Sequence, residues 1–144
     1  MIRVVLADDH TLMREGLKHI LQNAPDIEIC AEATDGFETV QLVRKTPFDV
    51  LVMDLSMPGR CGMELIRQIK DEAPKLAILV LTMHEEDEYA ARTIRAGAMG
   101  YMTKEGAGTQ LVNAIRRVAS GRPYISMEVA EQLAIEAMPA HEKL

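Results

Sequence analysis

The chain has 144 residues, 48% of them hydrophobic and 26% charged, with a formal net charge of −6. These values predict one globular domain with a substantial core, and the negative charge without a basic block argues against direct binding of a nucleic-acid backbone. The N-terminus MIRVVLADD is too short and acidic for a signal peptide and no apolar run reaches the roughly 18 residues of a membrane span, so we expect a cytoplasmic protein without a membrane segment.

Five apolar runs have the length and composition of β-strands. They cover Ile2–Ala7, Ile27–Ala33, Val50–Met53, Ala77–Met83 and Gly100–Thr103. We interpret Cys30, inside the second run, as a core residue and Cys61 as a loop residue, because their spacing is not that of metal ligands.

Amphipathic helical patterns follow each of these runs. The first helix has Met13, Leu17, Ile20 and Leu21 on one face, and the second has Phe37, Val40 and Val43, with Thr34 or Asp35 as its cap. The third has Met63, Leu65, Ile66 and Ile69 and ends before Pro74, and the fourth covers Glu85 to Ala96. The fifth has an apolar stripe formed by Leu111, Val112, Ile115, Val118 and Ala119. Strict alternation of buried strands and helices predicts a doubly wound α/β domain, with a parallel sheet covered by helices on both faces.

A further segment follows the fifth helical pattern. Met127 to Met138 has apolar residues at helical spacing, and residues 139–144 have the composition of a linker or of the edge of a further region. We therefore expect one domain over residues 1–121 and a linker with a short helix over residues 122–144.

In an open parallel sheet, ligands bind beyond the carboxyl ends of the strands. The residues at these ends are Asp8, Asp9, Asp54, Thr82 and Lys104. Adjacent carboxylates repel each other, and hard oxygen ligands suit Mg²⁺, so the acidic pair indicates a divalent cation site.

Asp54 leaves a buried strand in VLVMDLSMPGRCG and meets a loop containing Pro58, Gly59 and Gly62. A carboxylate in this position can attack a phosphoryl group, while the cation and Lys104 neutralise the phosphoryl oxygens and Thr82 donates a hydrogen bond. Each residue also has an ordinary alternative role, as a helix cap, a surface lysine or a β-branched residue that ends a strand. Their common location favours the phosphoryl site.

The segments LADDH, VLVMDLSMPG, LVLTM and GYMTK together resemble the receiver domain of two-component response regulators, over Ile2 to Gly121. The resemblance implies a flavodoxin-like sheet of order 2-1-3-4-5. It also implies that Asp54 is the phosphoacceptor for a sensor histidine kinase, that Thr82 moves onto the phosphoryl group, and that Tyr101 rotates inward as part of the same switch.

The same resemblance implies how the cation is held. Asp9, Asp54 and the backbone carbonyl of Ser56 would bind Mg²⁺ directly, and Asp8 would act mainly through water. His10 follows the acidic pair, and for it we favour a capping or surface role over a metal-ligand role.

DDH, REGL, AGAMGYMTKEG and SGRPYIS are similar to the NarL/FixJ subfamily. This similarity implies a LuxR-type helix-turn-helix domain beyond the linker, and so DNA binding through a domain that these residues do not contain. Homodimerisation on phosphorylation is a further expectation. Its candidate surfaces are the Leu111–Ala119 helix, whose apolar stripe we interpret as core, and the Met127–Met138 segment.

Three other functions are weighed against this one. A stand-alone receiver would signal by protein contact alone. A Mg²⁺-dependent aspartyl phosphatase of the haloacid dehalogenase type would require an aspartate two residues after the nucleophile, where this chain has Ser56. A nucleotide-binding module would require a glycine fingerprint in place of ADDHTLMREG. We therefore expect a phosphoacceptor that is not an enzyme acting on other substrates.

Overall fold

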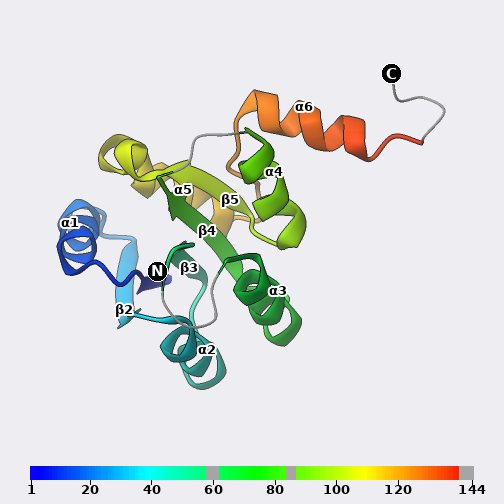
Figure 1. Ribbon diagram of the computed structural model, residues 1–144. Helices are drawn as coiled ribbons and strands as arrows, with labels where there is room; N and C mark the ends of the chain where they lie inside the picture. The colour runs from blue at the N-terminus through cyan, green and yellow to red at the C-terminus, as the bar shows by residue number, and fades with distance from the viewer. Residues whose placement is uncertain (58–61, 84–86, 140–144) are drawn as a thin grey trace.

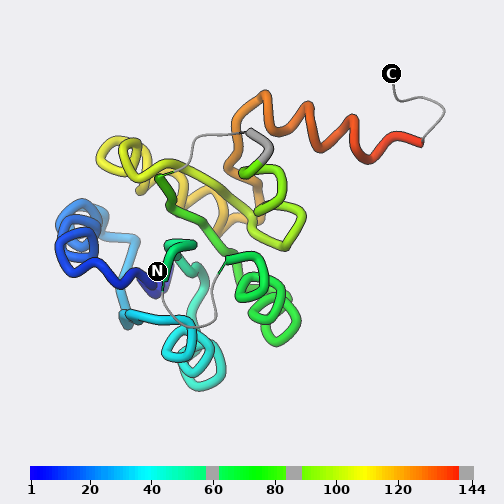
Figure 2. Tube along the Cα trace, viewed as in Figure 1, coloured from blue at the N-terminus to red at the C-terminus, as the bar shows by residue number. Residues whose placement is uncertain are grey.

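The computed structural model describes residues 1–57, 62–83 and 87–139. Its strands are β1 (Ile2–Ala7), β2 (Ile27–Ala33), β3 (Val50–Asp54), β4 (Ala77–Thr82) and β5 (Gly100–Thr103). Its helices are α1 (Thr11–Leu21), α2 (Gly36–Lys45), α3 (Gly62–Glu72), α4 (Asp87–Ala96), a 3₁₀ turn η1 (Lys104–Gly106), α5 (Ala107–Ala119) and α6 (Met127–Glu136). Strand and helix alternate from β1 to α5, as the tube in Figure 2 shows. The expected fold class is confirmed.

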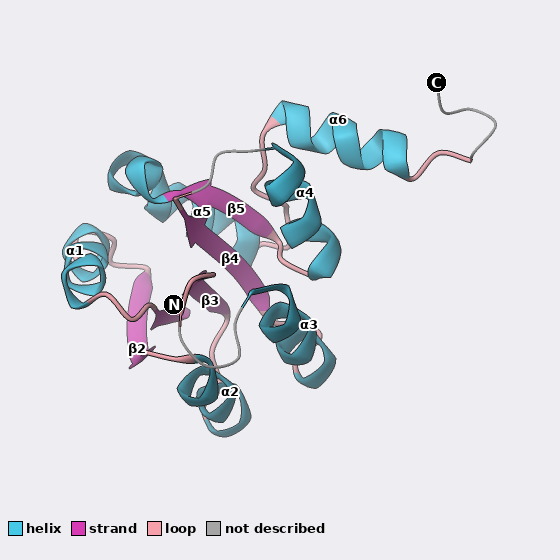
Figure 3. Cartoon of the chain, viewed as in Figure 1, coloured by secondary structure: helices cyan, strands magenta, loops and turns pink. Residues whose placement is uncertain are grey.

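The strands form one parallel sheet in the order β2-β1-β3-β4-β5, with helices on both sides (Figures 1 and 3). The chain moves outward from β1 to β2 and then returns past β1 to β3. The strand order therefore reverses between β1 and β3, which is where such sheets bind ligands. Asp8 follows β1 at this point, and Asp54 is the last residue of β3.

The core has two layers, one on each face of the sheet. Alternate residues of β1, such as Val4 and Val5, enter opposite layers because strand side chains alternate between faces. Helices α1 and α5 cover one face, and α2, α3 and α4 cover the other. Most of the apolar stripe of α5 is core, as expected, since Leu111, Ile115 and Val118 are buried, but Ala119, which was expected in the stripe, is exposed. The central strands are buried on both sides, which holds their carboxyl ends in fixed positions.

Helix ends follow the local sequence signals. The Asp35 side chain accepts a hydrogen bond from the backbone N–H of Glu38 and caps α2, one of the two caps expected. Helix α3 ends at Glu72, ahead of Pro74, and begins at Gly62, whose φ of 63° favours glycine. The other expected loop-shaping residues, Pro58 and Gly59, lie outside the described residues.

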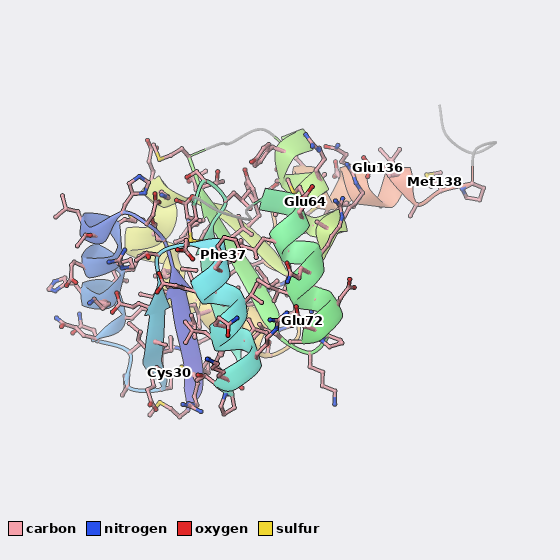
Figure 4. All side chains as sticks on the ribbon, turned by 60° about the horizontal axis from the view of Figure 1, so that its bottom comes forward. Cys30, Phe37, Glu64, Glu72, Glu136 and Met138 are labelled. Atoms are coloured by element: carbon pink, nitrogen blue, oxygen red, sulfur yellow. The ribbon has the colours of Figure 1, made fainter. Side chains whose placement is uncertain are left out.

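Several element boundaries and core assignments differ from expectation. Phe37 was expected on the buried face of α2, but it is 70% exposed and belongs to neither core layer; Figure 4 shows it in the first turn of that helix. Met83 was expected to end β4, but the strand ends at Thr82 and Met83 is exposed. Cys30, expected in the core, is partly buried and packs against one of the two core layers. Cys61 and the expected start of α4 at Glu85 lie outside the described residues.

Helix α6 packs against α4. Val129 and Leu133 of α6 form a small apolar cluster with Ala90 and Ala91 of α4. It extends past the sheet toward the C-terminus (Figure 1). Figure 4 places Glu136 and Met138 on this extending part, where Arg95 of α4 forms an ion pair with Glu136. Among the described residues, no helix combines the length and the apolar character that crossing a bilayer requires.

Candidate functional site

Three elements bring charged side chains together at the carboxyl edge of the sheet. The Lys104 ammonium, directly after β5, lies 3.1 Å from Asp54 Oδ2 and 3.5 Å from Asp8 Oδ2. The side chains of the two carboxylates are only 3–4% exposed, and that of the lysine is 11% exposed. Buried charges are tolerated when an opposite charge lies beside them. The ammonium of Lys104 therefore offsets the repulsion between the carboxylates of Asp8 and Asp54.

Asp54 is the most enclosed member of this group. The Ser56 hydroxyl lies 3.0 Å from Asp54 Oδ1 and 2.9 Å from Oδ2, and the Ser56 backbone N–H donates to Oδ1 over 3.2 Å. This local turn fixes the carboxylate after it leaves β3. One of its oxygens faces the Lys104 ammonium, so a phosphoryl group added there would lie next to a positive charge.

The loop after β1 holds Asp8, Asp9 and His10. Asp8 Oδ1 accepts hydrogen bonds from the backbone N–H of His10 over 2.9 Å and from the ring Nδ1 of His10 over 3.0 Å. The guanidinium of Arg14 donates to the backbone oxygen of Asp8 over 2.6 Å, while its Nε bonds Glu32 of β2. The acidic loop is therefore tied both to α1 and to the neighbouring strand.

The donor set of this group suits a divalent cation. Asp8, Asp9, His10 and Asp54 each offer a ligand atom, and these four atoms lie within 4.8 Å of one another. Three of them are carboxylate oxygens, which Mg²⁺ accepts as ligands. The structure thus supports the expectation of a metal-binding acid cluster here.

Thr82 and Tyr101 lie on the two strands beyond β3. Thr82 is buried at the end of β4, and because its neighbour Leu81 pairs with Asp54, it lies at the same edge as that carboxylate. Tyr101 is half-buried in β5 opposite Val80, with its ring centroid 6.4 Å from that of Tyr89 in α4. Tyr101 therefore connects the sheet to α4 instead of joining the acid cluster.

Sequence reasoning missed three contacts in this site. The Ser56 hydroxyl was not expected to bond Asp54, although the two-residue spacing after an aspartate is a common local turn. His10 occupies the N-cap position of α1 but makes no side-chain cap hydrogen bond. Its ring is exposed, in keeping with the expected surface position, but its contacts with the carboxylates of Asp8 and Asp9 were not expected. The contact between Arg14 and Asp8 had no sequence signal that we can identify.

A wide groove lies elsewhere among the described residues. It has a volume of about 800 Å³ and runs along the amino edge of the sheet. It is lined by Phe48, Asp49, Lys70, Ala77, Met99 and neighbouring residues. No residue of the acid cluster lines it. The cluster is therefore a site at the opposite edge of the sheet, where Asp9 and His10 are exposed.

The sequence matches known proteins across nearly its whole length. A family model described as the response regulator receiver domain matches residues 4–116. The response regulator UvrY of Escherichia coli strain K12 is 41% identical over 135 residues, which make up 94% of this chain and 62% of UvrY. The chain thus spans less than two thirds of the length of this relative.

Solved structures agree with this match. A LuxR-family two-component response regulator from Aurantimonas sp. SI85-9A1 superposes with a TM-score of 0.83 at 38% identity, covering 93% of this chain and 96% of that one. The isolated REC domain of RcsB from Salmonella enterica serovar Typhimurium, determined with phosphomimetic BeF₃⁻, superposes with a TM-score of 0.82 at 30% identity, covering 92% and 98%.

Proposed function

Because this chain belongs to the response regulator receiver domain family, we propose that it accepts a phosphoryl group on Asp54 from the phosphohistidine of a sensor histidine kinase. Receiver domains generally act as phosphoacceptors and not as conventional enzymes. The observation that carries the proposal is the position of the Lys104 ammonium, 3.1 Å from a carboxylate oxygen of the buried Asp54. The chain promotes its own phosphorylation and dephosphorylation and has no other substrate.

In this reaction an Asp54 oxygen attacks phosphorus, and the bond between phosphorus and the donor's imidazole nitrogen breaks. The nitrogen keeps the electron pair and is protonated from solvent, and an acyl phosphate remains on Asp54. Lys104 stabilises the charge on the phosphoryl oxygens, which is where phosphoryl transfer gains most of its acceleration. Ser56 orients the carboxylate before attack through its hydrogen bonds.

The residues that would hold Mg²⁺ are Asp9, Asp54 and the backbone carbonyl of Ser56, with Asp8 acting through water. When bound there, Mg²⁺ would supply positive charge that offsets the negative charge of the phosphoryl oxygens. Asp8 suits an indirect role, because its oxygens are already shared by Lys104 and the His10 backbone. Asp9, whose side chain is 32% exposed, keeps its carboxylate accessible to an ion.

Phosphorylation would cause a conformational change that passes through Thr82 and Tyr101. The Thr82 hydroxyl gains a charge-assisted hydrogen bond once a phosphoryl group is present at the same edge of the sheet. Its movement would allow Tyr101 to turn inward, and the ring contact between Tyr101 and Tyr89 would carry that change to α4. Two side chains thus couple the site to the helix against which α6 packs.

We propose that the phosphorylated receiver controls transcription. We place the receiver at residues 1–121 and a linker with α6 at residues 122–144, leading to a C-terminal helix-turn-helix domain. DNA would be bound through that domain, with homodimerisation on phosphorylation. The matched part makes up 62% of the response regulator UvrY, which extends beyond it, and this supports a further output domain over a stand-alone receiver. The protein would act in the cytoplasm.

The proposal is tested by treating the chain with acetyl phosphate and MgCl₂, measuring its intact mass, and locating the adduct by borohydride trapping. One phosphoryl group on Asp54 is expected. Asp54→Asn should remove the labelling, whereas Asp71→Asn, at an exposed position of α3, should leave it unchanged. A borohydride adduct on a residue other than Asp54 would contradict the proposal.

A further inference from the structure

We infer that Arg14 is a positioning residue for the cation site: its guanidinium fixes the peptide unit between Asp8 and Asp9, and it thereby sets how tightly the chain binds Mg²⁺. This role rests on the proposed function for the presence of the ion. It goes further because it assigns a determinant of affinity to a side chain that contributes no ligand, and it names Glu32 as the partner that holds this side chain in place.

Arg14 joins three parts of the fold near the start of α1. Its Nη1 atom donates a hydrogen bond to the backbone oxygen of Asp8 over 2.6 Å, and its Nε atom donates to Glu32 Oε1 of β2 over 3.1 Å. The Arg14 side chain is only 13% exposed. A guanidinium presents its donors in a rigid planar fork, so the two bonds together fix its direction. Arg14 therefore connects α1, the loop after β1 and the neighbouring strand.

The oxygen that Arg14 holds controls the position of Asp9. The peptide bond is planar, so this oxygen lies in one plane with the Cα atoms of Asp8 and Asp9. The amino side of Asp8 is also held, because its N–H donates to the backbone oxygen of Ala33 over 3.0 Å. Fixing the oxygen therefore fixes the point from which the Asp9 side chain starts. That side chain is 32% exposed, so its placement depends on the backbone more than on packing.

The backbone of Arg14 holds the other end of the same loop. Its N–H donates to the carbonyl oxygen of His10 over 3.0 Å, while its side chain reaches Asp8. A single residue thus bonds the loop on both sides of Asp9. A substitution of Arg14 that keeps the helix releases only the Asp8 end, which is the end next to β1.

The positive charge of Arg14 is neutralised on the side away from the acid cluster. An uncompensated guanidinium would repel a divalent cation. Glu32 accepts hydrogen bonds from Arg14 and, over 3.1 Å, from the Lys18 ammonium, which lies 2.8 Å from a carboxylate oxygen of Glu15. The two cations and two anions of this network sum to zero charge. Arg14 can therefore hold the loop without opposing the attraction between Mg²⁺ and the carboxylates.

The test compares Arg14→Met with Arg44→Met. Both variants lose a guanidinium that bonds a glutamate of another element, but Arg44 bonds Glu72 of α3 instead of the acidic loop. Dissociation constants for Mg²⁺ are measured by titration calorimetry on the whole chain. Arg14→Met should weaken Mg²⁺ binding by about tenfold or more, and Arg44→Met should change it by less than about twofold. Unchanged or tighter binding in Arg14→Met would overturn the inference, because tighter binding would mean that charge repulsion outweighs positioning.

A measurement on the metal-free chain separates positioning from a general loss of stability. The carbonyl carbon NMR signal of Asp8 should shift in Arg14→Met, because its oxygen loses a charge-assisted hydrogen bond, and amide exchange in β1 should stay as slow as before. An Asp8 signal identical to that of the unaltered chain, or exchange that rises throughout β1, would contradict the positioning role.

Glu32→Gln is a second variant, at a side chain that is 33% exposed. It keeps the shape of the residue and removes the charge that holds and neutralises Arg14, so Mg²⁺ binding should weaken, by less than in Arg14→Met, and the loss should shrink as salt is added. Unchanged affinity would contradict the assignment of Glu32 as the partner.

Phosphorylation of Asp54 with Mg²⁺, measured separately, distinguishes this inference from the proposed function. If the chain is phosphorylated on Asp54 and binds Mg²⁺, but Arg14→Met binds the ion equally well, only the role of Arg14 is lost. If the unaltered chain binds no Mg²⁺, the cation site and this inference fail together.

Discussion

The ammonium of Lys104 and the carboxylate of Asp54 are fifty positions apart in the sequence, and they lie 3.1 Å from each other at one edge of the sheet. This contact exists because β3 and β5 flank β4 in a parallel arrangement, so that both residues emerge on the same side. The side chain of Asp54 is 3% exposed, and so the attraction acts where water screens it poorly. The phosphoryl chemistry proposed here depends on this pair.

Replacing Lys104 is expected to slow phosphorylation. Lys104→Ala removes the positive charge next to the attacked group, and loss of one such stabilising group costs roughly tenfold or more in rate. The labelling rate with acetyl phosphate should fall accordingly, as followed by mass spectrometry over time. Lys75→Ala, at an exposed position before β4, is the matched control. An unchanged rate in Lys104→Ala would show that the pair has no role in the reaction.

The two adjacent aspartates are expected to contribute unequally to Mg²⁺ binding. Asp9→Asn should weaken the affinity more than Asp8→Asn does, because Asp8 is already bonded to Lys104 and to the His10 backbone. Removing a direct ligand costs more than removing a group that acts through water. Titration calorimetry on both variants gives the comparison, and equal losses would count against the assignment of Asp9 as the direct ligand.

Helix α6 is expected to depend on one buried side chain. Val129 is 3% exposed between α6 and α4, whereas Ile135, on the same helix, is 54% exposed. Val129→Asp would place a charge in the small apolar cluster and should increase amide hydrogen exchange in α6 by about tenfold or more, while the sheet stays protected. Ile135→Asp should leave α6 as protected as before. Equal exchange in the two variants would contradict this attachment.

The ion pair between Asp26 and Arg116 is expected to make stability depend on pH. Both guanidinium hydrogen bonds to the carboxylate are 2.9 Å long, and they hold the pKa of Asp26 below its ordinary value. A lowered folded-state pKa stabilises the fold above the ordinary carboxyl pKa, and this contribution is lost as pH falls through the folded value.

Arg116→Met should therefore return the pKa of Asp26 toward its ordinary value, as measured by carboxyl-carbon NMR. It should also flatten the dependence of the melting temperature on pH in the acidic range. Arg67→Met, at an exposed position of α3, serves as the control. The pair is at the surface, so its contribution to the free energy of unfolding is small. An unshifted Asp26 signal would refute the assignment.

The sequence by itself determined the elements and the side of the sheet on which the site lies. A buried strand such as β4 shows in the sequence as a continuous run of apolar residues, and a helix shows as apolar residues at helical spacing. Both patterns can be recognised because they involve residues close together in the chain. Once the strands are parallel, their carboxyl ends share one edge. Asp8, Asp54 and Lys104 therefore follow from strand ends alone.

Only the tertiary structure decided contacts that depend on packing between elements. Phe37 has the spacing of a core residue, yet the first turn of α2 leaves it exposed. His10 has the position of a cap, yet its ring lies among carboxylates that come from two different strands. The attachment of α6 through Val129 depends on the surface that α4 offers. Local periodicity cannot report such contacts, because it records which face is apolar and not which partner covers that face.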